Sequence, residues 1–215
     1  MSRLLSASLI AACCALGATQ ARADTVDLTN WTYSGVNVNV HVADTHFNYA
    51  GQGGGFSGAL NGAPIATYCL DLYQEFYFGG VYSNYTVGGG TLSSRAAQDI
   101  GRLVTQDGGK VVDANSSAAF QLALWEVLYE SPATAYNLNS GNFTGSGGGT
   151  STALANSWLN GLGVGAASNV HVQRLYSAEN QDFLVITAVP EPSNYAMFGA
   201  GLGLLAFLSR RKRGA

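Results

Sequence analysis

The chain has 215 residues, of which 47% are hydrophobic and only 11% are charged. The hydrophobic fraction excludes a disordered chain, and the length suffices for one domain with a sizeable core. Residues 24–189 contain four basic and twelve acidic residues, a net charge of −8 that argues against nucleic acid or anionic lipid as a partner. The 28 glycines are typical of a secreted, β-rich surface protein.

The N-terminus has the pattern of a secretory signal peptide. Arg3 supplies a positive charge, residues 4–17 are apolar or small, and Ala21 and Ala23 form a small-x-small cleavage pattern. We therefore expect the segment up to Ala23 to engage the Sec machinery and to be removed by signal peptidase. The mature chain would then begin at Asp24.

The first half of the body has the patterning of β-strands. Valines recur at every second position from 36 to 42, with polar residues between them, which indicates a half-buried strand. A glycine triplet at 53–55 lacks the Lys-Ser/Thr ending of a phosphate-binding loop. We expect strands or hairpins at residues 25–42, 44–62, 65–72 and 81–87.

The second half is expected to contain three helices and then two strands. The second helix would begin at Asp113 or Asn115, either of which can cap it. The expected helices cover residues 94–106, 116–130 and 152–159, with a glycine-rich loop at 140–149 and strands at 169–176 and 182–189. This order predicts an α+β domain over residues 24–188. Its antiparallel β-sheets, sandwich or barrel-like, would have about three helices packed between or against them.

Cys69 is the only cysteine expected in the mature protein, because Cys13 and Cys14 lie in the predicted signal peptide. A lipoprotein signal with Cys13 as the lipidated residue is an alternative, although the apolar run before it is short. A lone thiol in an exported protein is a buried inert group, an intermolecular disulfide or a reactive group.

Gln121 is the informative polar residue of the second predicted helix. At about 100° per residue it lies beside Leu124 and Trp125, and on the opposite side from Glu126 and Glu130. A buried carboxamide without partners costs about 1–3 kcal/mol. We therefore expect Gln121 to be hydrogen-bonded, either to nearby backbone or within a reactive site.

The two segments together resemble a known family. Tyr-Cys-Leu-Asp at 68–71, followed by Gln-Leu-Ala-Leu-Trp-Glu at 121–126, resembles the motif pair of the thioester domain of bacterial surface adhesins. Phe120 departs from the threonine that is usual in that family. The resemblance implies an internal thioester between Cys69 and Gln121, flanked by Tyr68, Asp71, Leu124 and Trp125.

Such a bond implies a covalent adhesin rather than an enzyme with turnover. The Cys69 thiolate would attack the Gln121 carbonyl and release ammonia, and an amine or hydroxyl of a surface or matrix ligand would later displace the sulfur. Asp71 and Glu126 are candidate proton carriers, and each is also explained as an ordinary solvated or hydrogen-bonded acid. No cofactor is expected.

Other functions for the body also fit the sequence. The acidic surface rich in Tyr, Asn and Gly suits a non-covalent matrix or carbohydrate-binding protein in which Cys69 is inert. A Cys–His hydrolase would use His41, His46 or His171, but none lies in a recognisable motif. The spacing of these histidines also fits no pattern of metal ligands, so no metal site is expected.

The C-terminal segment, 189–215, has three parts in a fixed order. Val189-Pro190-Glu191-Pro192 precedes an apolar run at 195–208, and the basic cluster Arg210-Arg211-Lys212-Arg213 follows. The apolar run is shorter than the ~20 residues of a comfortable membrane span, and the basic cluster would stop transfer. This order resembles the PEP-CTERM sorting signal of Gram-negative bacteria. It implies transient residence in the inner membrane, processing by an exosortase, and delivery to the cell surface or the extracellular (biofilm) matrix.

Overall fold

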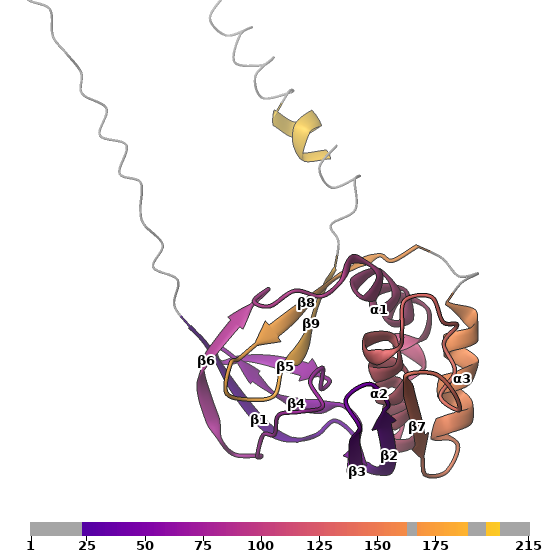
Figure 1. Ribbon diagram of the computed structural model, residues 1–215. Helices are drawn as coiled ribbons and strands as arrows, with labels where there is room; N and C mark the ends of the chain where they lie inside the picture. Colours follow the sequence, from indigo (N-terminus) through magenta and orange to yellow (C-terminus); the bar gives the residue numbers. More distant parts are fainter. Residues whose placement is uncertain (1–22, 163–166, 189–196, 203–215) are drawn as a thin grey trace, which may run out of the picture.

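The computed structural model describes residues 23–162, 167–188 and 197–202 (Figure 1). The described body has two antiparallel sheets and a group of helices packed against them, which confirms the predicted α+β class. Several residues that the sequence analysis singled out lie outside the described ranges: Cys13, Ala21, Val189, Pro190, Glu191, Pro192, Arg210, Arg211, Lys212 and Arg213.

The larger sheet has six strands in the order β5-β4-β1-β6-β8-β9. Their bounds are β1 Asp24–Trp31, β4 Phe56–Leu60, β5 Ala63–Thr67, β6 Val81–Val87, β8 Val170–Tyr176 and β9 Phe183–Ala188. The expected first mature residue, Asp24, begins β1, and its carboxylate accepts hydrogen bonds from Asn61 Nδ2 at 2.7 Å and from Val87 N at 3.0 Å. The first described strand therefore begins at the residue expected to start the mature chain.

The larger sheet nearly closes into a barrel. The free edge of β9 pairs with the chain that leaves β5: Leu184 N donates to Tyr68 O at 3.0 Å, and Cys69 forms an isolated bridge with Phe183. The strand expected at 65–72 is therefore too long. Its regular pairing with β4 ends at Thr67, and residues 68–70 change partner from β4 to β9.

The smaller sheet has three strands, in the order β3-β2-β7. Strand β2 (Val36–Val42) lies between β3 (Phe47–Gly53) and β7 (Phe143–Gly147). The single strand expected at 25–42 is wrong, because a bend at residues 32–35 separates β1 in one sheet from β2 in the other. Strand β7 lies within the expected loop.

The central helix is α2 (Ala114–Tyr129), which packs against α1, α3 and the smaller sheet (Figure 1). Asp113 is its N-cap in a reciprocal capping box, as one of the two expected starts: Ser116 N donates to Asp113 Oδ1 at 2.7 Å, and Asp113 N donates to Ser116 Oγ at 3.0 Å. Glu126 and Glu130, which helical periodicity places on the side opposite Gln121, are also buried. They are 0% and 5% exposed, because α2 is covered on all sides.

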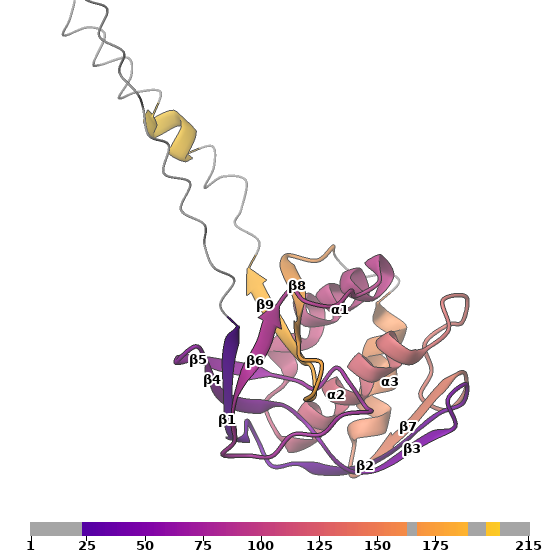
Figure 2. The same ribbon diagram turned by 60° about the vertical axis from the view of Figure 1, so that its left-hand side comes forward.

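Two further helices and a short 3-10 turn complete the body (Figure 2). Helix α1 (Ser94–Asp107) and helix α3 (Ser151–Gly161) lie close to the predicted positions, and the turn η1 (Gly108–Lys110), which was not predicted, follows α1. Across the described ranges, no helix has both the length and the apolar character to cross a bilayer. Of the apolar run expected at 195–208, only residues 197–202 are described, as a helical segment with exposed side chains.

Candidate functional site

Cys69 lies at the seam where the larger sheet closes. On one side of it Tyr68 O accepts from Leu184 N, and on the other Leu70 N donates to Asp182 O at 2.8 Å. Successive residues of an extended strand direct their N–H and C=O groups to opposite sides. The backbone groups of Cys69 therefore point away from β9 and towards α2.

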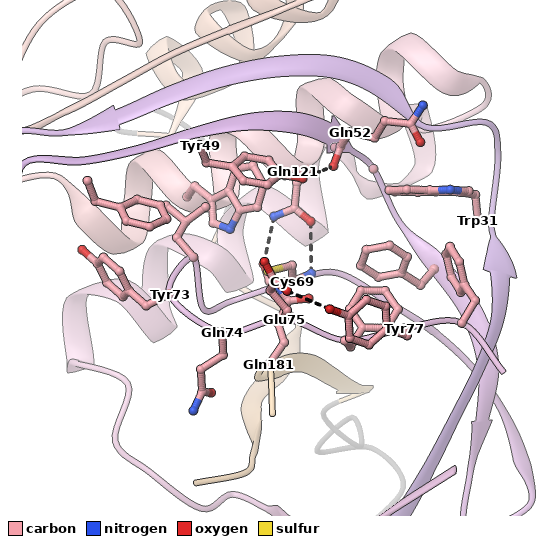
Figure 3. Close-up of a pocket in the computed structure, with 18 of the residues that line it drawn as sticks. Trp31, Tyr49, Gln52, Cys69, Tyr73, Gln74, Glu75, Tyr77, Gln121 and Gln181 are labelled. Carbon is pink, nitrogen blue, oxygen red and sulfur yellow. Dashed lines mark hydrogen bonds between the residues drawn. The ribbon is translucent and has the colours of Figure 1, made fainter. Parts of the chain in front are cut away.

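The Gln121 side chain of α2 meets these backbone groups. Cys69 N donates to Gln121 Oε1 at 3.0 Å, and Gln121 Nε2 donates to Cys69 O at 2.8 Å (Figure 3). The carboxamide thus pairs with Cys69 as a neighbouring strand would. Gln121 is only 1% exposed, so these bonds also satisfy its buried polar atoms. The two residues that the sequence resemblance pairs are in contact.

The Cys69 thiol is buried and free. Its sulfur donates to Asp71 O at 3.0 Å and accepts a hydrogen bond from Gln181 Nε2. Burial raises the pKa of the Cys69 thiol well above its ordinary value, and the N–H of nearby Trp125 lowers this pKa in part. Because the sulfur is covered, an intermolecular disulfide would require the site to open.

Tyr68 and Phe120, which precede Cys69 and Gln121, pack on one another. The Tyr68 ring lies 4.7 Å from the Phe120 ring, and Tyr68 Oη is 3.4 Å from Ser117 Oγ. Phe120, which departs from the usual family residue, therefore supports the strand that carries Cys69. A glycine is required at 55 in this arrangement, because a Cβ there would lie 2.9 Å from the Tyr68 ring.

The other predicted flanking residues have distinct places. Leu124 is fully buried in the core, whereas Trp125 lines the space beside Cys69 and contacts the Tyr49 ring edge-to-face at 6.1 Å. Asp71 Oδ1 accepts from Tyr73 N at 2.8 Å, so its side chain stabilises the turn that follows the thiol.

A cleft of about 640 Å³ leads from the surface to Cys69 and Gln121 (Figure 3). Its lining is mainly aromatic rings and uncharged amides. Among the described residues, Glu75 is the only carboxylate in the lining, and no lysine, arginine or histidine contributes to it. Tyr73 and Tyr77 are 47% and 71% exposed. The aromatic side chains that line it are Trp31, Phe47, Tyr49, Phe56, Tyr73, Phe76, Tyr77, Phe78 and Trp125.

Gln181 is the residue of this site that the sequence analysis missed. It lies two residues before β9 and reaches Cys69 because the barrel closes between them. Nothing in the pattern of the last two strands indicates this closure, so the sequence offered no signal for Gln181.

The other sequence candidates lie away from the thiol. None of His41, His46 and His171 lines the cleft, and in the described part of the chain no three His, Cys, Asp or Glu side chains form a metal-binding group. Glu126 Oε1 accepts from Asn137 N at 2.6 Å, beside the loop that leads to β7. Glu126 itself does not line the cleft.

Comparison with known proteins identifies one part of the chain. Residues 188–213 match the family model of the PEP-CTERM protein-sorting motif, which confirms the prediction for the C-terminal segment. The motif implies an exosortase as the processing partner and supports an exported surface protein that is sorted at the membrane. No curated protein and no solved structure matches the chain, so the thioester resemblance of the body stays a prediction.

Proposed function

We propose that the body of this exosortase-sorted protein forms an internal thioester between Cys69 and Gln121 and uses it to attach covalently to a partner at the cell surface or in the matrix. The observation that carries the proposal is the pair of hydrogen bonds between the Gln121 carboxamide and the Cys69 backbone, at the base of an open cleft. These bonds fix the electrophile beside the residue that bears the nucleophile.

The same bonds suit the chemistry of the Gln121 carbonyl. Cys69 N–H donates to Oε1, the atom that gains negative charge when sulfur adds to the carbonyl carbon. The S–C bond forms, the C–N bond breaks, and the thiol proton leaves with the nitrogen as ammonia. In the later attachment step a partner amine forms a C–N bond, the S–C bond breaks, and the amine proton passes to sulfur.

The position of the cleft supports a role in attachment. Trp31 at the end of β1 and Gln181 just before β9 both line it, so it lies at one end of these strands. The sorting motif begins at residue 188, at the other end of β9. Six residues at about 3.3 Å each place the motif roughly 20 Å from the cleft. The cleft therefore lies at the opposite end of β9 from the start of the sorting motif.

Intact mass spectrometry of the exported protein tests the proposal. With the thioester, the mass is lower by one ammonia, and methylamine both adds its own mass and releases one thiol. Cys69→Ser is the matched control, since it retains Gln121 and its backbone bonds but removes the sulfur. A natively folded protein with full mass and an already free thiol would overturn the proposal.

The runner-up function is non-covalent binding of a carbohydrate or matrix polymer in the same cleft. It is favoured by the exposed rings of Tyr73 and Tyr77 beside uncharged amides, a combination that suits sugar faces and hydroxyls. The two functions differ in one measurement: bound material survives denaturation only if the link is covalent.

A further inference from the structure

We propose that the indole N–H of Trp125 and the carboxamide N–H of Gln181 form a two-donor site for the Cys69 sulfur, which stabilises the thiolate both when the thioester forms and when a partner displaces it. This inference rests on the proposed function and adds the groups that carry the charge on sulfur.

Gln181 already contacts the sulfur. Its Nε2 donates to Cys69 Sγ and also to Asp71 O at 2.9 Å. Its backbone is fixed by two further bonds, because Gln181 O accepts from Tyr85 Oη at 2.7 Å and Gln181 N donates to Glu75 O. A side chain with an anchored backbone loses little freedom when it binds a charged atom, so Gln181 is a preorganised donor.

Trp125 provides the second donor. Its Nε1 is buried and has no hydrogen-bond acceptor within the described residues, although indole N–H groups usually find one when buried. Trp125 follows Gln121 by four residues, which places both on one face of α2. An unpartnered donor beside a thiol gains an acceptor when the sulfur becomes anionic, because hydrogen bonds to charged atoms are stronger than those to neutral ones.

Negative charge on the Cys69 sulfur is stabilised by neutral hydrogen-bond donors. Within the described ranges, no lysine, arginine or histidine lines the cleft, and burial opposes a charge on sulfur. In thioester formation the thiol proton, which sulfur donates to Asp71 O in this structure, passes to the departing nitrogen. The N–H groups of Trp125 and Gln181 meanwhile stabilise the negative charge on sulfur. In attachment, the breaking S–C bond returns an electron pair to sulfur, and the same two donors receive the charge.

The test removes each donor. Gln181→Met removes the carboxamide, with both the N–H donated to sulfur and the N–H donated to Asp71 O. Trp125→Phe removes the indole N–H together with one ring, and replacement of Trp125 by benzothienylalanine removes the N–H while preserving the bicyclic ring. Trp158→Phe and Gln173→Met are matched controls, because Trp158 in α3 and Gln173 in β8 do not line the cleft. Melting temperatures identify any variant that fails to fold.

Two rates are measured. The first is thiol release by methylamine, which we expect to slow about tenfold for each lost donor. The second is alkylation of the free Cys69 thiol between pH 6 and 9, in methylamine-treated protein. We expect it also to slow about tenfold at each pH, as it would if the thiol pKa rose by about one unit.

The outcomes separate this inference from the proposed function. If the untreated protein has full mass, the thioester proposal fails, but the alkylation rates still test the two donors. If the thioester is present and both rates stay within about twofold of wild type in folded variants at both positions, a factor worth less than one ordinary hydrogen bond, the two-donor site is overturned.

Discussion

Helix α2 uses buried polar side chains in two regions, the middle of the helix, which faces the cleft, and its C-terminal end. At the cleft, Gln121 pairs with the backbone of one residue, Cys69. At the C-terminal end, Glu130 accepts hydrogen bonds from Ser131 N, Asn142 N and Phe143 N, at 2.7, 3.1 and 3.3 Å. In both regions a side chain of α2 or of its C-cap pairs with backbone groups that the neighbouring strands leave without a partner.

The difference between the regions lies in what the backbone carries. The segment that Glu130 stabilises leads to β7 and has no nucleophile, whereas the segment that Gln121 stabilises presents a thiol at the base of a cleft. Hydrogen bonding between a helix side chain and neighbouring backbone therefore indicates only a structural role. The reactive role of Gln121 depends on the sulfur and on access through the cleft.

The largest effect is expected at Glu130. Glu130→Ala leaves three backbone N–H groups without their acceptor, which should lower the free energy of unfolding by about 4 kcal/mol. Glu130→Gln retains one acceptor oxygen and should cost about half as much. Urea denaturation measures both. Equal stability of Glu130→Ala and wild type would contradict the structural role assigned to this end of α2.

The next largest effect separates the two roles of Gln121. Gln121→Ala removes the acyl carbon and leaves Cys69 N and O unpaired, so it should lose the thioester and about 3 kcal/mol of unfolding free energy. Cys69→Ala should lose the thioester but retain both backbone bonds, at a cost of about 1 kcal/mol. Mass spectrometry and denaturation are compared for the two variants. If both are destabilised equally, the backbone pairing is not what Gln121 contributes.

The sequence predicted the helices and most strands, but it did not predict that the larger sheet nearly closes into a barrel. The helix start at Asp113 follows from local capping chemistry. Strand β7 was missed because Gly145 and Gly147 resemble loop residues. A Cβ at either position would lie 3.1 Å from a methyl group of Leu122, so these glycines allow α2 to approach the sheet.

The candidate site was predictable only in part. The Cys69–Gln121 pairing came from motif resemblance, and the burial of Gln121 from helical periodicity. Gln181 depends on a contact between strands distant in sequence, which no local pattern specifies. The burial of Glu126 was also missed, because a carboxylate normally indicates a solvent-exposed face.

A pH dependence is expected from Glu126. Burial, and to a smaller extent the nearby Glu130 carboxylate, raise the pKa of Glu126 to about 7, although Asn137 N and Arg95 favour its charged form. The native state therefore binds more protons than the unfolded state between pH 4.5, the ordinary pKa of the group, and about 7. The stabilising contribution is complete below pH 4.5 and is lost as the pH rises through 7.

Glu126→Gln isolates this contribution. The difference in unfolding free energy between wild type and the variant should change by about 3 kcal/mol from pH 4 to pH 8, in favour of the variant at high pH. Asp182, whose pKa is also raised by burial, titrates in both proteins and cancels in the difference. A difference that does not vary with pH would show that Glu126 is not the titrating group.

The smallest effect is expected at Tyr129, which connects the end of α2 to the chain that follows Cys69. Its hydroxyl accepts from Leu72 N at 3.0 Å and donates to Leu70 O at 3.2 Å. Tyr129→Phe removes both bonds but preserves the ring that stacks on Phe143, so it should cost about 1 kcal/mol. Because Gln121 still pairs with Cys69 in this variant, the mass deficit of one ammonia should persist. A full-mass Tyr129→Phe protein would mean that the thioester also depends on the segment after Cys69. The pairing of Gln121 with Cys69 would then not be sufficient for thioester formation.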